Sequence, residues 1–142
     1  MAFCSCKSLT EVVFAEESQL RIIGKKAFCE CGKLIIKLPE GVEVIPEGCF
    51  CDSGIKEIGI LASVQTIEKN AFDKCESLKK VSFADCSQLR EIGEDAFKGC
   101  NNLVLTLPEG LTSIGEEWFK ESGINEISIP ASVRNIGKSA FN

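Results

Sequence analysis

Nine cysteines are the residues of this 142-residue chain with the widest chemical repertoire. A cysteine thiolate can attack an electrophile, bind a soft metal ion or form a disulfide. The chain contains no histidine and no tyrosine, so the commonest general base and a common general acid are missing. A catalytic thiol would depend on lysine or carboxylate side chains as its base, and the sequence therefore favours a protein that is not an enzyme.

Four of the cysteines share one position relative to a phenylalanine. They stand three residues after it, at Cys6, Cys31, Cys75 and Cys100. Serine occupies the same position at Ser53 and Ser122. A position that accepts either residue is typical of a small buried slot with a weak hydrogen-bond donor, where reactivity is not needed.

A second group of cysteines could in principle hold a metal ion. Three of them directly follow a phenylalanine: Cys4, Cys29 and Cys51. With Cys6 and Cys31 they form C-x-C clusters that could bind a thiophilic metal. The matching positions later in the chain are Asp73, Lys98 and Lys120. A metal that the module needed would not be missing from half of it, so the sequence predicts no metal and no other cofactor. A disulfide stays open, although the odd cysteine count favours reduced thiols.

Adjacent carboxylates could also act as an acid and base pair. Glu94 and Asp95 are such a pair, but Lys25 and Lys26 stand at the matching place in the first half of the chain. Because a position that carries either sign of charge is typical of solvated surface, we interpret these carboxylates as surface residues.

The residues that must position these side chains belong to a repeat. Phenylalanines recur at spacings of 25, 22, 22, 25, 22 and 22, namely at Phe3, Phe28, Phe50, Phe72, Phe97, Phe119 and Phe141. A shift of 69 residues superimposes residues 3–72 on 72–141 with about half of the positions identical. Periods of roughly 20 to 29 residues are typical of solenoids, whose units fold only by stacking on their neighbours.

We divide the chain into a single array of six repeats that form two 69-residue modules. The repeats are about 3–27, 28–49, 50–71, 72–96, 97–118 and 119–141. Neither end shows a polar capping repeat, so we expect a segment of a longer protein or an engineered array. The open terminal repeats also suggest end-to-end self-association.

Each repeat contains three apolar clusters. The first is a short strand pattern, as in IKEIGI (55–60). The second is a return segment around one aliphatic residue, often followed by a glycine that we expect to have a positive φ, as at Gly24, Gly93, Gly115 and Gly137. The third is the phenylalanine, which we expect to stack from repeat to repeat into a structural spine of Phe28, Phe50, Phe72, Phe97 and Phe119. The three extra residues of the longer repeats fall before the strand and in the turn after it.

The repeat pattern C-x-x-L-x-x-V-x-(I/F)-P-x-x-(L/V)-x-x-I-G-x-x-A-F resembles the BspA-like leucine-rich repeat, also called the TpLRR class. The best matching stretches are CNNLVLTLPEGLTSIGEEWF (100–119) and SGINEISIPASVRNIGKSAF (122–141). The resemblance implies a mainly β repeat solenoid: a right-handed leucine-rich-repeat horseshoe segment with a parallel sheet on the concave face and short turns or strands on the convex face. It also implies a non-catalytic adhesion or recognition module of a surface or secreted protein, with a host cell-surface or matrix protein as partner.

The strand register predicts which side chains would meet such a partner. The expected partner-binding residues on the concave sheet are Glu11, Val13, Ile35, Lys37, Lys56, Glu57, Lys79, Lys80, Val104, Thr106, Asn125 and Glu126. The apolar members Val13, Ile35 and Val104 either anchor a partner or merely support β structure. Trp118 stands where alanine is usual, and either covers a gap in the convex face or anchors an interface.

The composition of the chain narrows the classes of partner and the cellular locations that remain. A net charge of -5 argues against nucleic acid, because binding to phosphates requires clustered Lys and Arg. No apolar run approaches the roughly 20 residues that cross a bilayer, so we expect no membrane insertion. Two functions stay open: an adhesion or recognition module presented at the cell surface or secreted, and an intracellular or engineered scaffold without a dedicated ligand, for which a cytoplasmic location remains possible.

Overall fold

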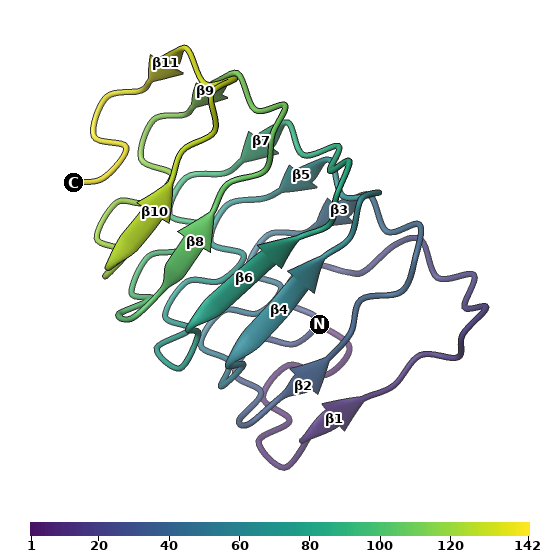
Figure 1. Ribbon diagram of the computed structural model, residues 1–142. Helices are drawn as coiled ribbons and strands as arrows, with labels where there is room; N and C mark the ends of the chain where they lie inside the picture. The colour runs from purple at the N-terminus through teal and green to yellow at the C-terminus, as the bar shows by residue number, and fades with distance from the viewer.

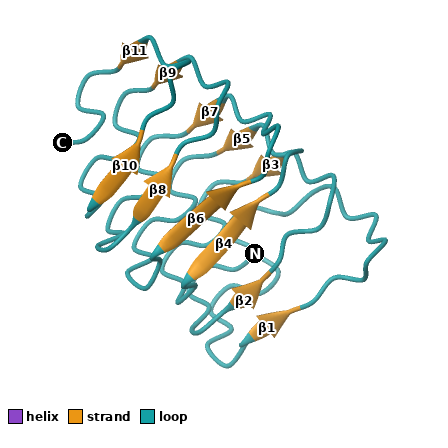
Figure 2. Ribbon diagram, viewed as in Figure 1, coloured by secondary structure: helices purple, strands orange, loops and turns teal.

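The computed structural model describes all residues from 1 to 142 and shows a β-solenoid without helices (Figures 1 and 2). Each repeat forms one turn of the coil, which we call a rung. The strands are β1 (Glu11–Val12), β2 (Ile35–Ile36), β3 (Val44–Ile45), β4 (Glu57–Ile60), β5 (Thr66–Ile67), β6 (Lys80–Phe83), β7 (Glu91–Ile92), β8 (Val104–Thr106), β9 (Ser113–Ile114), β10 (Glu126–Ser128) and β11 (Asn135–Ile136). No helix long and apolar enough to cross a bilayer is present.

One side of the coil carries one strand from every repeat, and we call these strands the front sheet: β1, β2, β4, β6, β8 and β10. All of their pairings are parallel, with Glu57 opposite Lys80, Lys80 opposite Val104 and Val104 opposite Glu126. Burial alternates along each strand, as in β4, because alternate side chains of a strand point to opposite faces. The inward set packs into the core, and the outward set is left to solvent.

The other side of the coil carries the back strands β3, β5, β7, β9 and β11. They are two residues long and parallel, and they form the sheets β3-β5-β7 and β9-β11 behind the front sheet in Figure 1. Each contains one of the aliphatic residues of the return segment. These residues are fully buried in the inner rungs, as at Ile45 and Ile67. These two sides confirm the predicted mainly β repeat solenoid with a parallel sheet.

The longer repeats fit without breaking the strand register. β6 belongs to a 25-residue repeat, yet it pairs with β4 and β8 of the shorter repeats on either side. The extra residues therefore lie outside the strand, in the segments that join it to the rest of the rung.

The core is one continuous cluster of 34 buried residues. At its centre the spine phenylalanines are buried, and consecutive rings stack with centroids between 5.2 and 5.8 Å apart and planes inclined by 2° to 19°. Main-chain hydrogen bonds run alongside, since the amide of Phe50 donates to the Ala71 carbonyl and that of Phe72 to the Ala96 carbonyl. The ring stacking and these hydrogen bonds thus connect each rung to the next.

Two left-handed backbone positions flank each spine phenylalanine. The residues two before it are Lys26, Gly48, Asn70, Asp95, Glu117 and Ser139, and the residues two after it, starting with the rung of Phe3, are Ser5, Glu30, Asp52, Lys74, Gly99 and Glu121. All twelve have positive φ, and in the ten that are not glycine φ lies between 50° and 60°. The sequence analysis missed these positions, although their Asn, Asp and Gly members are the residues that tolerate such angles best.

The glycines of the return segment differ from the prediction. None of Gly24, Gly93, Gly115 and Gly137 has a positive φ, so the expected left-handed corner is wrong. A Cβ atom on Gly93 would lie 2.7 Å from the backbone carbonyl carbon of Glu68 in the preceding rung, and one on Gly137 would lie 2.7 Å from that of Gly115. Glycine is required at these two positions because the neighbouring backbone leaves no space for a side chain.

Candidate binding face

The front sheet presents all of the predicted partner-binding residues to solvent. Every one of them is exposed: Glu11, Val13, Ile35, Lys37, Lys56, Glu57, Lys79, Lys80, Val104, Thr106, Asn125 and Glu126. We call these residues the front face. Their exposure follows from the strand alternation, and their role in binding stays a prediction.

Three aliphatic side chains interrupt the polar character of the front face. Val13 is 78% exposed, Ile35 69% and Val104 47%. In the same strands the inward neighbours Ile36 and Leu105 are buried. The three exposed side chains therefore gain no stabilisation from burial in the core, and they are free to contact a partner.

The front face is hollowed into a groove. A cavity of about 1010 Å³ lies over β2, β4 and β6, and a second of about 630 Å³ continues over β6 and β8. Lys80 and Ser82 line both cavities, so the two form one hollow that crosses the strands, which we call the front groove. Gly59 opens its floor, because a Cβ there would meet only Ser82 Oγ, at 3.8 Å.

The hydrogen-bonded ladder of the front sheet is interrupted under this groove. β1 pairs with β2, and β4 pairs with β6, but no ladder joins β2 to β4. The wider cavity lies at this interruption, where Ile36 of β2 and Ile58 of β4 both border it. The two strands that border the wider cavity are therefore not joined by a hydrogen-bonded ladder.

Lysines outnumber acidic residues in the groove. Its wider cavity is lined by four lysines and one acidic residue, namely Lys33, Lys37, Lys56, Lys80 and Glu57. The narrower cavity adds Lys79, Asp85 and Glu109, so the positive charge is concentrated in the wider one. Lys33 lies before the strand, and its contribution was not predicted by strand alternation. None of these lysines forms an ion pair, even though Glu57 is the register partner of Lys80.

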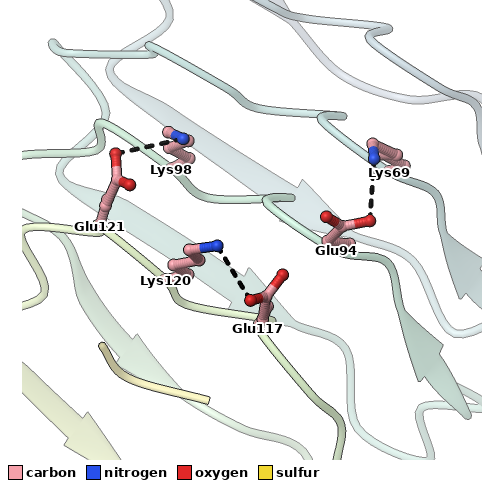
Figure 3. A network of polar contacts seen from close by, with 6 residues as sticks. All are labelled: Lys69, Glu94, Lys98, Glu117, Lys120 and Glu121. Atoms are coloured by element: carbon pink, nitrogen blue, oxygen red, sulfur yellow. Dashed lines mark hydrogen bonds and ion pairs between the residues drawn. The ribbon is translucent and has the colours of Figure 1, made fainter. Parts of the chain in front are cut away.

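Lysines near the spine turns behave differently. Figure 3 shows three ion pairs there: Lys69 with Glu94 at 2.8 Å, Lys98 with Glu121 at 3.1 Å and Lys120 with Glu117 at 2.9 Å. Lys25 pairs with Glu47 at 2.8 Å in the same way. The hydrogen bond from Lys69 lowers the pKa of the Glu94 carboxyl. The solenoid therefore supplies carboxylate partners to four lysines beside the spine and to none in the front groove.

The predicted cysteine slot is buried at Cys31, Cys75 and Cys100, but Cys6 is exposed, so the prediction of a buried slot is wrong in the first rung. The thiols of Cys31, Cys75 and Cys100 donate to the carbonyls of phenylalanines in the first, third and fourth rungs, with sulfur to oxygen distances of 3.1, 2.9 and 3.3 Å. Burial raises the pKa of the Cys75 thiol to about 12. A thiol that stays protonated at neutral pH and donates to a backbone carbonyl is a structural residue and a poor nucleophile.

The cysteines that follow the phenylalanines lie in neighbouring rungs, as expected from the repeat. Burial and the nearby Cys51 and Cys4 raise the pKa of the Cys29 thiol to about 12. Cys51 in turn donates to Asp73 Oδ2 of the next rung at 3.9 Å. All nine cysteines are free thiols, and no cluster of three or more His, Cys, Asp or Glu side chains is arranged to hold a metal ion.

Trp118 belongs to the core. It is 6% exposed and lies edge-on to Phe119, with ring centroids 6.4 Å apart. Its indole occupies the space where Gly115 lacks a side chain. Of the two predicted roles for Trp118, the structure therefore shows the gap-covering one and contradicts the exposed interface anchor.

The stacked parallel strands, the phenylalanine spine and the hollowed front sheet define a leucine-rich-repeat solenoid. Comparison with protein families confirms this class: the model of the BspA type leucine-rich repeat region matches in six copies, over residues 1–104 and 86–142. The chain belongs to this family.

A leucine-rich repeat protein of known crystal structure, from Bacteroides ovatus, has a similar fold. The TM-score is 0.59 at 23% sequence identity, over 94% of this chain and 40% of the other. This chain therefore spans about two fifths of that protein. The search of curated proteins finds no sequence match.

Proposed function

We propose that this chain is a non-catalytic recognition or adhesion module of a larger cell-surface or secreted protein, and that it binds a protein partner through the front face. The observation that carries the proposal is the front groove, which combines exposed aliphatic side chains, unpaired lysines and an interrupted ladder in one hollow. Repeat proteins of the leucine-rich class generally serve protein interaction, and their extended sheets supply wide binding surfaces.

The chemistry of the side chains supports a non-catalytic role. Burial raises the pKa of the Cys31, Cys75 and Cys100 thiols, so these cysteines stay protonated. The wider cavity of the front groove contains lysines and a single glutamate, and in the narrower cavity Cys86 forms no hydrogen bond with a base.

The test is a binding assay against purified host cell-surface and matrix proteins. The double variant Ile35→Glu plus Val104→Glu places two charges on the front face, and we expect it to lose binding that the wild type shows. Protein interfaces concentrate their energy in a few desolvated contacts, so two such changes should lower affinity by roughly tenfold or more.

Ile22→Glu is the matched control, because Ile22 is an exposed aliphatic residue outside the front face. Circular dichroism would establish that all variants remain folded. Equal binding by wild type and double variant, or an equal loss in the control, would remove the front face from the proposal.

The nine free thiols favour a second candidate, an intracellular or engineered scaffold without a dedicated ligand. Disulfides are rare in reducing compartments, where free cysteines persist. A count of free thiols on protein produced under oxidising conditions distinguishes the two. A folded protein that keeps nine free thiols under these conditions would favour the surface or secreted module, because the chain would tolerate an oxidising environment. Aggregation through intermolecular disulfides would favour the intracellular scaffold.

A further inference from the structure

We propose that the front groove binds an extended acidic segment of a partner protein, rich in Asp and Glu and carrying at least one aliphatic residue. This inference rests on the proposed function and adds the chemistry of the partner. It follows from how charge and shape are distributed over the front sheet.

The first argument is the concentration of positive charge. The chain as a whole carries a net charge of -5. The lysines of the front sheet nevertheless gather in three consecutive rungs, at Lys33, Lys37, Lys56, Lys79 and Lys80, where they outnumber the acidic lining residues Glu57, Asp85 and Glu109. The rest of the surface is correspondingly more acidic, so an acidic segment is attracted to this groove and repelled elsewhere.

The second argument is that these lysines lack partners within the chain. Four lysines beside the spine turns each have a carboxylate within 3.1 Å. The geometry of the rungs can therefore place a carboxylate next to a lysine. Glu57 lies opposite Lys80 in the strand register, yet the two form no ion pair. Lysines left free in a hollow are available to carboxylates of another molecule.

The third argument concerns the shape of the ligand. The groove crosses the strands from β2 to β8, and its two cavities join at Lys80 and Ser82. Four front strands spaced about 4.8 Å apart span about 15 Å, which an extended peptide of about five residues would fill at about 3.3 Å per residue. Because such a peptide runs across the strands, it would contact the groove through its side chains and would not add to the sheet as a further strand.

The fourth argument favours a protein segment over a nucleic acid. Glu57 and the exposed Ile35 lie among the lysines, so carboxylate and aliphatic groups alternate with positive charge along the groove. A nucleic acid would need continuous neutralisation of its phosphates, and its length would carry it onto the acidic surroundings. A short segment that mixes carboxylates with an aliphatic side chain matches both kinds of group.

The test is fluorescence anisotropy with a labelled peptide of about ten residues, made of Glu and Asp with two central Leu residues. Two matched probes accompany it: the same peptide with Gln and Asn for the acids, and a single-stranded oligonucleotide. We expect the full chain to bind the acidic peptide with an affinity that falls as salt rises, and to bind the amide peptide at least roughly tenfold more weakly.

Two triple variants with equal charge change locate the site. Lys37→Gln, Lys56→Gln and Lys80→Gln remove charge from the groove, whereas Lys25→Gln, Lys69→Gln and Lys98→Gln remove it beside the spine. We expect the groove variant to lose affinity for the acidic peptide by roughly tenfold or more and the other to change it by less than about twofold, because charge attraction weakens within about 10 Å at moderate salt.

Several outcomes would overturn the inference: no binding of the acidic peptide, equal losses in both triple variants, or tighter binding of the oligonucleotide than of the peptide. The aliphatic variant Ile35→Glu plus Val104→Glu separates the two proposals. If it loses binding to a matrix or cell-surface protein while the groove lysine variant keeps it, the front face stands and the acidic partner is wrong. If neither variant loses any binding, both proposals fail.

Discussion

At the scale of single residues, the tight turn around each spine phenylalanine depends on two left-handed backbone positions. Side chains other than glycine occupy most of them, including lysine at Lys26 and Lys74. A Cβ atom in this conformation lies too close to the following carbonyl, which costs about 1 to 2 kcal/mol per residue. The turns therefore hold strain that the stacking of the rungs must offset.

Replacement of Lys74 by glycine should relieve part of this strain. Lys74 is exposed, has φ of 56° and forms no ion pair. We expect Lys74→Gly to raise the free energy of unfolding by up to about 1 kcal/mol, since the greater freedom of glycine in the unfolded chain opposes the gain. Urea denaturation measures this change in the free energy of unfolding. Lys74→Ala keeps the Cβ atom and should show no gain; a gain of equal size there would point to the lysine side chain and away from the backbone.

In the cysteine slot behind the spine, a side chain that donates a hydrogen bond should stabilise the fold more than an apolar side chain of similar size. Cys75 donates to the buried Phe50 carbonyl, and Ser53 occupies the same position in another rung. We expect Cys75→Val to lower the free energy of unfolding by about 0.5 to 1.5 kcal/mol, because it removes one of the two hydrogen bonds that this carbonyl accepts and leaves the one from the Ser53 amide. Cys75→Ser keeps a donor and should cost less. Thermal unfolding of both variants tests the order, and a serine variant that is the less stable would show that packing of sulfur dominates.

At the scale of elements, a rung is held mainly by its neighbours. The spine rings stack between rungs, and the front and back strands pair between rungs. A strand of two residues, such as β3 or β5, has no stability of its own. The rung is therefore a unit of sequence, and only the stack of rungs is a unit of folding.

Truncation of a spine ring should cost far more inside the array than at its end. Phe72 is fully buried between the rings of Phe50 and Phe97, whereas Phe141 has a neighbour on one side and is 43% exposed. We expect Phe72→Ala to lower the free energy of unfolding by about 3 to 5 kcal/mol and Phe141→Ala to lower it by less than half of that. Chemical denaturation measures both. Similar losses would mean that the rungs contribute independently of their position.

Prediction from sequence worked best at this element scale. The strand alternation that placed Glu57 outward and Ile58 inward needs only the local period of two, and the structure agrees. The return glycines show the opposite case. Their identity was visible, but the reason for it lies in the backbone of the preceding rung, which approaches Gly93 and Gly137 too closely for a side chain.

At the scale of the whole molecule, the two sides of the array differ in charge, and the terminal rungs of the 142-residue chain differ in exposure from the inner ones. The acidic chain concentrates unpaired lysines in the front groove, and ion pairs line the spine turns. At the ends, Phe3 is 44% and Ile136 57% exposed, although their counterparts in the inner rungs are buried. The end rungs thus present the same apolar surface that is covered elsewhere in the stack.

We expect the isolated 142-residue chain to self-associate through these ends as its concentration rises. Sedimentation velocity over a range of concentrations would measure it. Ile136→Lys should weaken the association, because it places a charge on the exposed terminal rung. Val104→Lys makes the same change on an exposed aliphatic residue in the middle of the array and serves as control. A monomer at all concentrations, or an equal effect of both variants, would contradict association through the ends.

The sequence by itself determined the repeat, the six rungs, the buried spine and the outward residues of the front sheet. All of these follow from the pattern of apolar residues that recurs in every repeat. This pattern can be recognised without knowing how closely the rungs approach one another. The tertiary structure alone decided which lysines have a carboxylate partner, where the front ladder is interrupted, why Gly93 must be glycine and that Trp118 fills the space beside Gly115. These features depend on how closely two rungs approach and which way their side chains turn, and such contacts between units are not encoded in the period of either one.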